Sequence, residues 1–172
     1  VICVPMEGRR LDALQIPMMH YSLDPYFQTP FTLSVDAANG TSGISASSRL
    51  ATIKQLVNPN SRPTDFVMPG HIFPLRSHPD GVFGRTGHTE AAVDLAQLAG
   101  LTPAAVIGEV IDEHGEVARL PYLTVFAKKH GAKAPVEIVP NGVNLGRIEK
   151  KSDGKTVITT SRLVKKNGLD IL

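Results

Sequence analysis

Between Gly84 and Glu90 the chain reads Gly-Arg-Thr-Gly-His-Thr-Glu, which places an arginine, two threonines and a histidine beside two glycines. Glycine lets the backbone bend tightly and lets a ligand approach closely. A segment with helical spacing follows, and the N-terminus of a helix offers unpaired N–H groups to an anion such as phosphate. Arg85 adds a forked donor for that anion, and His88 can bind a metal or move a proton near neutral pH. A polar turn that only caps the helix is the alternative interpretation.

A second histidine with a constrained backbone is His71, which lies in the stretch Pro-Gly-His-Ile-Phe-Pro-Leu over residues 69–75. Two prolines and a glycine restrict the conformations of this stretch, and rigid loops often position functional side chains. The alternative is a histidine that stabilises the turn by bonding a neighbouring backbone group. His71 is therefore a candidate for proton transfer.

Two further polar positions are candidates for contact with a ligand. Glu109 lies inside the apolar run 105–111, where a carboxylate is either exposed at a sheet edge or buried as a candidate acid or base. Thr41 and Ser42 belong to a hydroxyl-rich turn ahead of a helix, and their hydroxyl groups could hold a phosphate. Capping of that helix is the alternative use of such residues.

The elements that must position these residues alternate between strands and helices up to about residue 139, which predicts an α/β fold. Strands are expected at 1–6, 31–35, 105–112 and 136–139, and helices at 10–14, 48–57, 90–99 and 121–130. Phe31, Leu33 and Val35 share the predicted buried face of their strand, and Ser47 or Ser48 is the expected cap of the second helix. Residues 60–76 are expected to form a proline-rich loop.

The C-terminal part of the chain differs in composition. An Asp-Gly turn at 153–154, flanked by Lys- and Thr-rich segments, predicts a β-hairpin over residues 147–164. We therefore expect a single α/β domain over residues 1–139, with a mixed sheet and flanking helices, and a C-terminal β-hairpin extension over 140–172.

Composition excludes several classes of function. The chain has 172 residues and a formal net charge of +2, so no polyanionic partner such as nucleic acid is indicated. No apolar run approaches the roughly 20 residues that a membrane helix needs. Cys3 is the only cysteine, which excludes an internal disulfide and is typical of a cytoplasmic protein. Any metal must therefore use histidine and carboxylate ligands, which favours Mg²⁺ or Mn²⁺ over zinc.

Taken together, these stretches resemble the 3,4-dihydroxy-2-butanone 4-phosphate synthase family of riboflavin biosynthesis, over roughly residues 1–131. The motifs around His71 and His88 are specific in combination, since both occur in order and at the family's distance. The matching segments include Ile2–Met6, Phe31–Asp36, Gly43–Ala46, Pro69–Leu75 and Gly87–Leu95.

The resemblance implies a Mg²⁺-dependent lyase that converts ribulose 5-phosphate, through an enediol, to a four-carbon phosphorylated ketone and formate. Family members are homodimers whose sites are shared between subunits. Carried over by position, the metal ligand would be His88, and proton transfer would involve His71 and Glu109. The residues that would contact the substrate and its phosphate are Arg85, Gly87, Thr89 and Thr41 or Ser42.

The chain also departs from the family pattern. Nothing in it matches the family's acidic N-terminal loop, so we expect it to be N-terminally incomplete relative to the family. Ser48 occupies a position where the family has aspartate, and the tail is unlike the family's. The alternative interpretation is a catalytically degenerate or repurposed scaffold, which binds a sugar phosphate or acts as a partner subunit.

Overall fold

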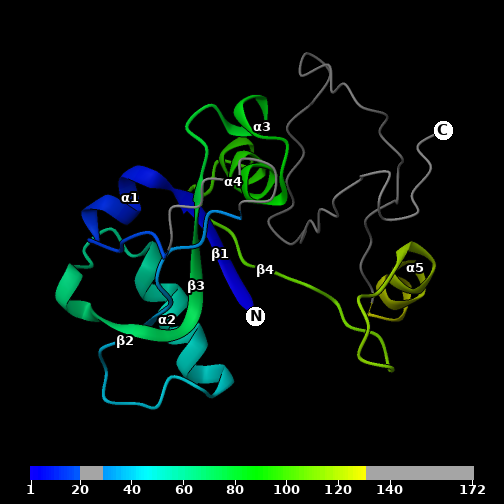
Figure 1. Ribbon diagram of the computed structural model, residues 1–172, viewed down its shortest axis with the longest axis horizontal. Coiled ribbons are helices and arrows are strands. Elements are labelled where there is room, and N and C mark those ends of the chain that lie inside the picture. Colours follow the sequence, from blue (N-terminus) through cyan, green and yellow to red (C-terminus); the bar gives the residue numbers. More distant parts are fainter. Residues whose placement is uncertain (20–28, 131–172) are drawn as a thin grey trace. The chain divides into compact units, whose positions relative to one another are not determined.

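The computed structural model describes residues 1–19 and 29–130 (Figure 1). Its contacts divide the chain into two compact units, residues 1–108 and the residues from Glu109 onward. The first unit contains a mixed four-stranded sheet with helices packed on it, which confirms the predicted α/β class. The predicted boundary at 139–140, the strand at 136–139 and the hairpin at 147–164 lie outside the described residues, so they stay predictions.

The sheet has the strand order β2-β3-β1-β4, in which β1 and β3 are parallel and the other two pairs are antiparallel. Four consecutive residues of β1, from Cys3 to Met6, are buried, which is typical of a strand covered on both faces. Burial also raises the pKa of the Cys3 thiol, which fits a core residue. The strands are β1 (Ile2–Glu7), β2 (Val35–Ala37), β3 (Phe66–Ser77) and β4 (Ile107–Gly108).

The helices follow the predicted order with small shifts at their ends. The second helix is capped by Ser45, whose hydroxyl accepts a hydrogen bond from the Ser48 N–H at 3.1 Å, so the predicted caps Ser47 and Ser48 were wrong by two or three positions. Gly100, with φ of 73°, follows the end of the fourth helix as predicted. The helices are α1 (Gly8–Ala13), α2 (Ala46–Val57), the 3₁₀ turn η1 (Pro63–Asp65), α3 (Gly81–Gly84), α4 (His88–Leu98) and α5 (Leu120–Lys129).

None of the helices within residues 1–19 and 29–130 has the length and apolar character that a membrane span requires.

The apolar core of the first unit lies between the sheet and the helices α1 and α2. Leu11, Leu14 and Leu56 are fully buried there against Ile72 of β3. The full set of buried core residues is Val4, Met6, Leu11, Leu14, Ile16, Val35, Leu56, Phe66 and Ile72. Because this core covers the sheet, it fixes β3, the longest strand, in place.

Two further local predictions differ from the structure. Residues 66–77 form the strand β3 rather than a loop. The strand tolerates Pro69 because this residue lies in the irregular part of the β2 pairing, ahead of Ile72, where the pairing with β1 begins. The predicted buried face of 31–35 is correct at Val35, which is fully buried, but wrong at Phe31 and Leu33, which are only partly buried. Thr32 and Ser34 are buried instead of Phe31 and Leu33, and the Thr32 hydroxyl compensates for its burial by donating to the Pro74 carbonyl at 2.9 Å.

The predicted strand at 105–112 is shorter than expected. Only Ile107 and Gly108 form β4, and Ile111 makes an isolated bridge to Val117 in the second unit. The last helix agrees with its prediction, since α5 covers Leu120–Lys129 and has Pro121 in its first turn.

Gly70 allows β2 to approach β3 directly beside His71. A Cβ at this position would lie 2.1 Å from the Val35 carbonyl carbon and 2.3 Å from the Asp36 nitrogen. Both atoms belong to the β2 backbone, so they cannot move aside as a flexible side chain would. The absence of a side chain at Gly70 is therefore what brings Asp36 to His71.

We predict that Gly70→Ala lowers the free energy of unfolding by about 1–3 kcal/mol or more, because the added methyl group overpacks a backbone contact. Gly108→Ala is the matched control in the same sheet, since its nearest neighbour, the Val1 carbonyl oxygen, is 3.9 Å away. Urea denaturation of the two variants checks the difference. Equal stability of both variants would contradict the close approach of β2 and β3.

Candidate functional site

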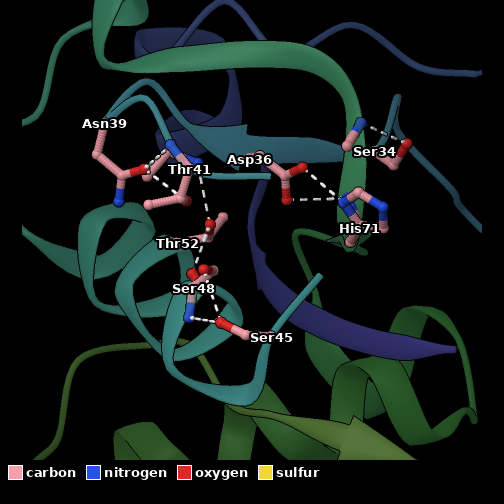
Figure 2. Close-up of polar contacts among 10 residues, drawn as sticks. Ser34, Asp36, Asn39, Thr41, Ser45, Ser48, Thr52 and His71 are labelled. Atoms are coloured by element: carbon pink, nitrogen blue, oxygen red, sulfur yellow. Dashed lines mark hydrogen bonds and ion pairs between the residues drawn. The ribbon is translucent and has the colours of Figure 1, made fainter. Parts of the chain in front are cut away.

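Asp36 of β2 and His71 of β3 form a polar pair across two neighbouring strands of the sheet (Figure 2). The His71 Nδ1 atom lies 2.6 Å from Asp36 Oδ2, and the His71 backbone N–H donates to Asp36 Oδ1 at 3.0 Å. The Asp36 side chain is 8% exposed and that of His71 is 37% exposed. One buried carboxylate therefore fixes both the backbone and the ring of His71.

This contact also determines which ring nitrogen can accept a proton. An ionised carboxylate only accepts hydrogen bonds, so Nδ1 must carry the hydrogen in its contact with Asp36. Nε2 of a neutral His71 is then the acceptor. A histidine held by a carboxylate in this way is suited to general acid–base catalysis.

The loop with the predicted substrate contacts Thr41 and Ser42 is joined to this pair. Gly43 lies against the Asp36 carboxylate, because a Cβ at Gly43 would be 2.0 Å from Asp36 Oδ2. Thr41 and Ser42 are exposed, and the Thr41 hydroxyl donates to Asn39 Oδ1 at 2.8 Å (Figure 2). We call Asp36, Thr41, Ser42 and His71 the His71 group.

The predicted phosphate-binding residues lie together at the start of α4, and we call Arg85, Gly87, His88 and Thr89 the Arg85 group. Gly87 is the N-cap of α4 and provides no side-chain acceptor for the first turn, so the helix end suits an anion. Arg85 lies one residue before the Thr86-Gly87 turn, and its NH1 donates to Glu90 Oε2 at 2.9 Å. Thr89 is buried, and its predicted phosphate contact stays a prediction.

The two groups are separated along β3. His71 precedes Ile72, which pairs with Ile2 at the start of β1, whereas Ser77 pairs with Glu7 at the end of β1. His78 follows Ser77, and its N–H donates to Glu90 Oε1 at 3.0 Å. His78 therefore lies beside the start of α4, where the Arg85 group is. Extended chain from residue 71 to residue 78 spans about 20 Å. Figure 1 shows the same separation, with β2 and α2 at one end of β3 and α3 and α4 at the other.

Glu109, the other predicted catalytic residue, is exposed and belongs to the second unit. The sequence left open whether this carboxylate is buried or exposed, and in the structure it is exposed. Its predicted part in proton transfer stays a prediction.

The described residues do not complete a metal site. Within residues 1–19 and 29–130, no three His, Cys, Asp or Glu side chains come together in a way that could hold an ion. The carboxylates of Glu90 and Asp94, on the same helix as His88, already accept hydrogen bonds from Arg85, His78 and Val82. Mg²⁺ needs oxygen ligands, so these residues alone do not fit it.

Sequence reasoning missed two functional candidates, Asp36 and Glu90. Asp36 lies between Val35 and Ala37 in β2 and is buried, and Glu90 of α4 is fully buried. A carboxylate is almost never fully buried without a partner, so the burial of both residues in the structure is the signal that identifies them. The partners themselves, 35 residues away for Asp36, could be found only in the structure.

The comparisons with known proteins agree on one family. The sequence profile of 3,4-dihydroxy-2-butanone 4-phosphate synthase matches residues 1–138. The enzyme of that name from Agrobacterium fabrum is 55% identical over 132 residues, which cover 76% of this chain and 62% of the relative. A second synthase, from Hamiltonella defensa, is 50% identical over 131 residues, covering 76% of this chain and 60% of the relative.

Solved structures give the same result. The synthase of Candida albicans has a TM-score of 0.69 and 46% identity, covering 76% of this chain and 64% of that one. A synthase in complex with two magnesium ions has a TM-score of 0.70 and 39% identity, covering 76% and 66%. The chain thus spans about three fifths of the length of the curated relatives described here. By both sequence and structure, this chain belongs to the 3,4-dihydroxy-2-butanone 4-phosphate synthase family.

Proposed function

We propose that this protein converts ribulose 5-phosphate to 3,4-dihydroxy-2-butanone 4-phosphate and formate in riboflavin biosynthesis. The observation that carries the proposal is the Asp36–His71 pair, which supplies an oriented proton acceptor in a chain of this family. The Arg85 group supports it with a helix N-terminus and an arginine suited to a phosphate. A lyase acting on a sugar phosphate needs both features.

The Arg85 group would bind the phosphate end of the substrate. The first-turn N–H groups of α4 point out of the helix end at Gly87, and the Arg85 guanidinium can bind phosphate oxygens in a forked arrangement. Binding the phosphate would anchor the substrate and leave its carbonyl end to the groups that transfer protons.

His71 would move protons at the carbon skeleton. Formation of an enediol removes a proton from a carbon beside the carbonyl group, and the Nε2 atom of His71 is the acceptor that the contact with Asp36 leaves available. Asp36 would stabilise the imidazolium that forms, as the carboxylate does in other acid–base dyads. Thr41 and Ser42 would donate hydroxyl hydrogen bonds to the substrate beside it.

We also propose that the reaction depends on Mg²⁺, with Mn²⁺ as the alternative ion and His88 as one ligand. The support is the related synthase in complex with two magnesium ions. Bound there, the ion would polarise the substrate carbonyl. Since the described residues lack the further oxygen ligands, those would come from substrate oxygens or from residues outside the described ranges.

We further propose that the working form is a homodimer in which one active site combines the His71 group of one chain with the Arg85 group of the other. The support is the length of β3 between His71 and His78, the residue that Glu90 holds, which is about 20 Å in an extended chain and exceeds the length of a five-carbon sugar phosphate. A two-fold dimer exchanges equivalent surfaces between chains, so two such sites would form together.

A cytoplasmic location completes the proposal. Its support is compositional, because a single cysteine that is buried in β1 is typical of proteins in a reducing compartment.

The first prediction for this function is that the full-length protein releases formate from ribulose 5-phosphate with Mg²⁺, and that excess chelator stops the release. His88→Ala should abolish metal-dependent turnover and leave the melting temperature within a few degrees, because it removes one ligand at a helix start. His114→Ala, at an exposed position, is the matched control and should retain turnover. Formate release that is unaffected by chelator, or retained in His88→Ala, would contradict the metal-ligand role.

The second prediction concerns Asp36. Asp36→Asn should lower kcat on the order of 10²-fold, because an amide cannot accept hydrogen bonds at both of its ends and one contact to His71 is lost. Asp65→Asn is the matched control, since Asp65 is bonded to Gln55 and Arg62 instead. Steady-state kinetics and the pH profile of kcat check the effect. An unchanged kcat and an unchanged profile would reject the acid–base role of the pair.

A further inference from the structure

Residues 78–87, the segment that joins β3 to α4, are held by two carboxylates of α4. Glu90 Oε1 accepts the His78 N–H at 3.0 Å, and Asp94 Oδ2 accepts the Val82 N–H at 2.9 Å. The two acids lie one helical turn apart, so they face the same side of α4. The path of the segment is therefore fixed at two points from one helix.

Three glycines of this segment, at positions 81, 84 and 87, leave room for these polar contacts. A Cβ at Gly81 would lie 2.5 Å from the Asp94 carboxylate oxygens, and one at Gly87 would lie 2.8 Å from Glu90 Oε2. At Gly84 the same space is occupied by the His78 ring, whose Nδ1 would be 1.8 Å away. The glycine spacing thus reflects the close packing of polar side chains, and not only the flexibility that the sequence suggested.

Glu90 differs from Asp94 in having a second partner. Its other oxygen, Oε2, receives the Arg85 NH1 at 2.9 Å, and the Glu90 side chain is 0% exposed while that of Arg85 is 37% exposed. The buried end of the ion pair is fixed by the His78 N–H, whereas the arginine end reaches solvent. A guanidinium carries five N–H donors, more than this contact uses.

We infer that Glu90 is the positioning residue for Arg85, and that it sets where the arginine presents its charge to the phosphate of a sugar phosphate. The inference rests on the proposed function for the role of Arg85. A buried carboxylate that accepts from a fixed backbone N–H is a rigid support, so the long arginine side chain loses less freedom when it binds an anion. Asp94 supports the same segment without contacting Arg85, which makes it the matched control.

The first test compares Glu90→Gln with Asp94→Asn in the full-length protein. Glutamine keeps the size of the side chain and one acceptor but loses the charge that holds Arg85. We expect Glu90→Gln to raise KM for ribulose 5-phosphate about tenfold with kcat within about threefold, the pattern of lost uniform binding. Asp94→Asn should leave KM within about threefold. Equal effects of the two variants on KM, at similar loss of stability, would reduce Glu90 to a structural role and overturn the inference.

The second test is a double-mutant cycle with Arg85→Ala, measured by calorimetry as Kd for ribulose 5-phosphate. If Glu90 acts through Arg85, then Glu90→Gln has at most about a twofold effect in the Arg85→Ala background. A full additive effect there would overturn the inference. If Glu90→Gln does not fold, Glu90→Asp takes its place, because aspartate keeps the charge but is too short to reach both partners. An unchanged Kd of Glu90→Asp for ribulose 5-phosphate would overturn the inference.

These measurements separate the inference from the proposed function. If the wild-type protein binds ribulose 5-phosphate but releases no formate, the proposed reaction is wrong. The double-mutant cycle, measured as Kd, still decides the role of Glu90 in that case. Wild-type protein that binds no sugar phosphate overturns both.

Discussion

The parallel pairing of β1 with β3 is the interaction on which both groups depend. It places His71 beside the start of β1 and brings His78, which Glu90 holds, just past its end. β1 is buried over four consecutive residues, so hydrophobic burial fixes the pairing from both faces. A slip of one residue in β3 would turn every side chain to the opposite face and separate His71 from Asp36.

The two groups use carboxylates in the same way. Asp36 binds the His71 N–H with one oxygen and the His71 ring with the other. Glu90 binds the His78 N–H with one oxygen and the Arg85 guanidinium with the other. In each case a buried acid fixes a backbone position and a functional side chain together, which holds the side chain in place before any ligand binds. The cost of burying each charge is offset by these donors.

The sequence predicted the elements whose local signals agree with one another. The apolar run of β1, the helical spacing and Gly100 at the end of α4, and Pro121 at the start of α5 all led to the observed elements. β3 was missed because Pro69 and Pro74 argue against a strand, and the buried face at Thr32 was missed because its hydroxyl is satisfied by a distant carbonyl. Asp36 and Glu90 were missed because their roles depend on partners across the fold.

We propose that one active site takes the His71 group from one chain and the Arg85 group from another. The most direct measurement mixes two variants that are each inactive, His71→Ala and Arg85→Ala, after subunit exchange. We expect recovery of about a quarter of the wild-type formate release, because half of the randomly formed dimers are mixed and each mixed dimer holds one intact site. A mixture that stays as inactive as its components, although mass spectrometry shows mixed dimers, would contradict it.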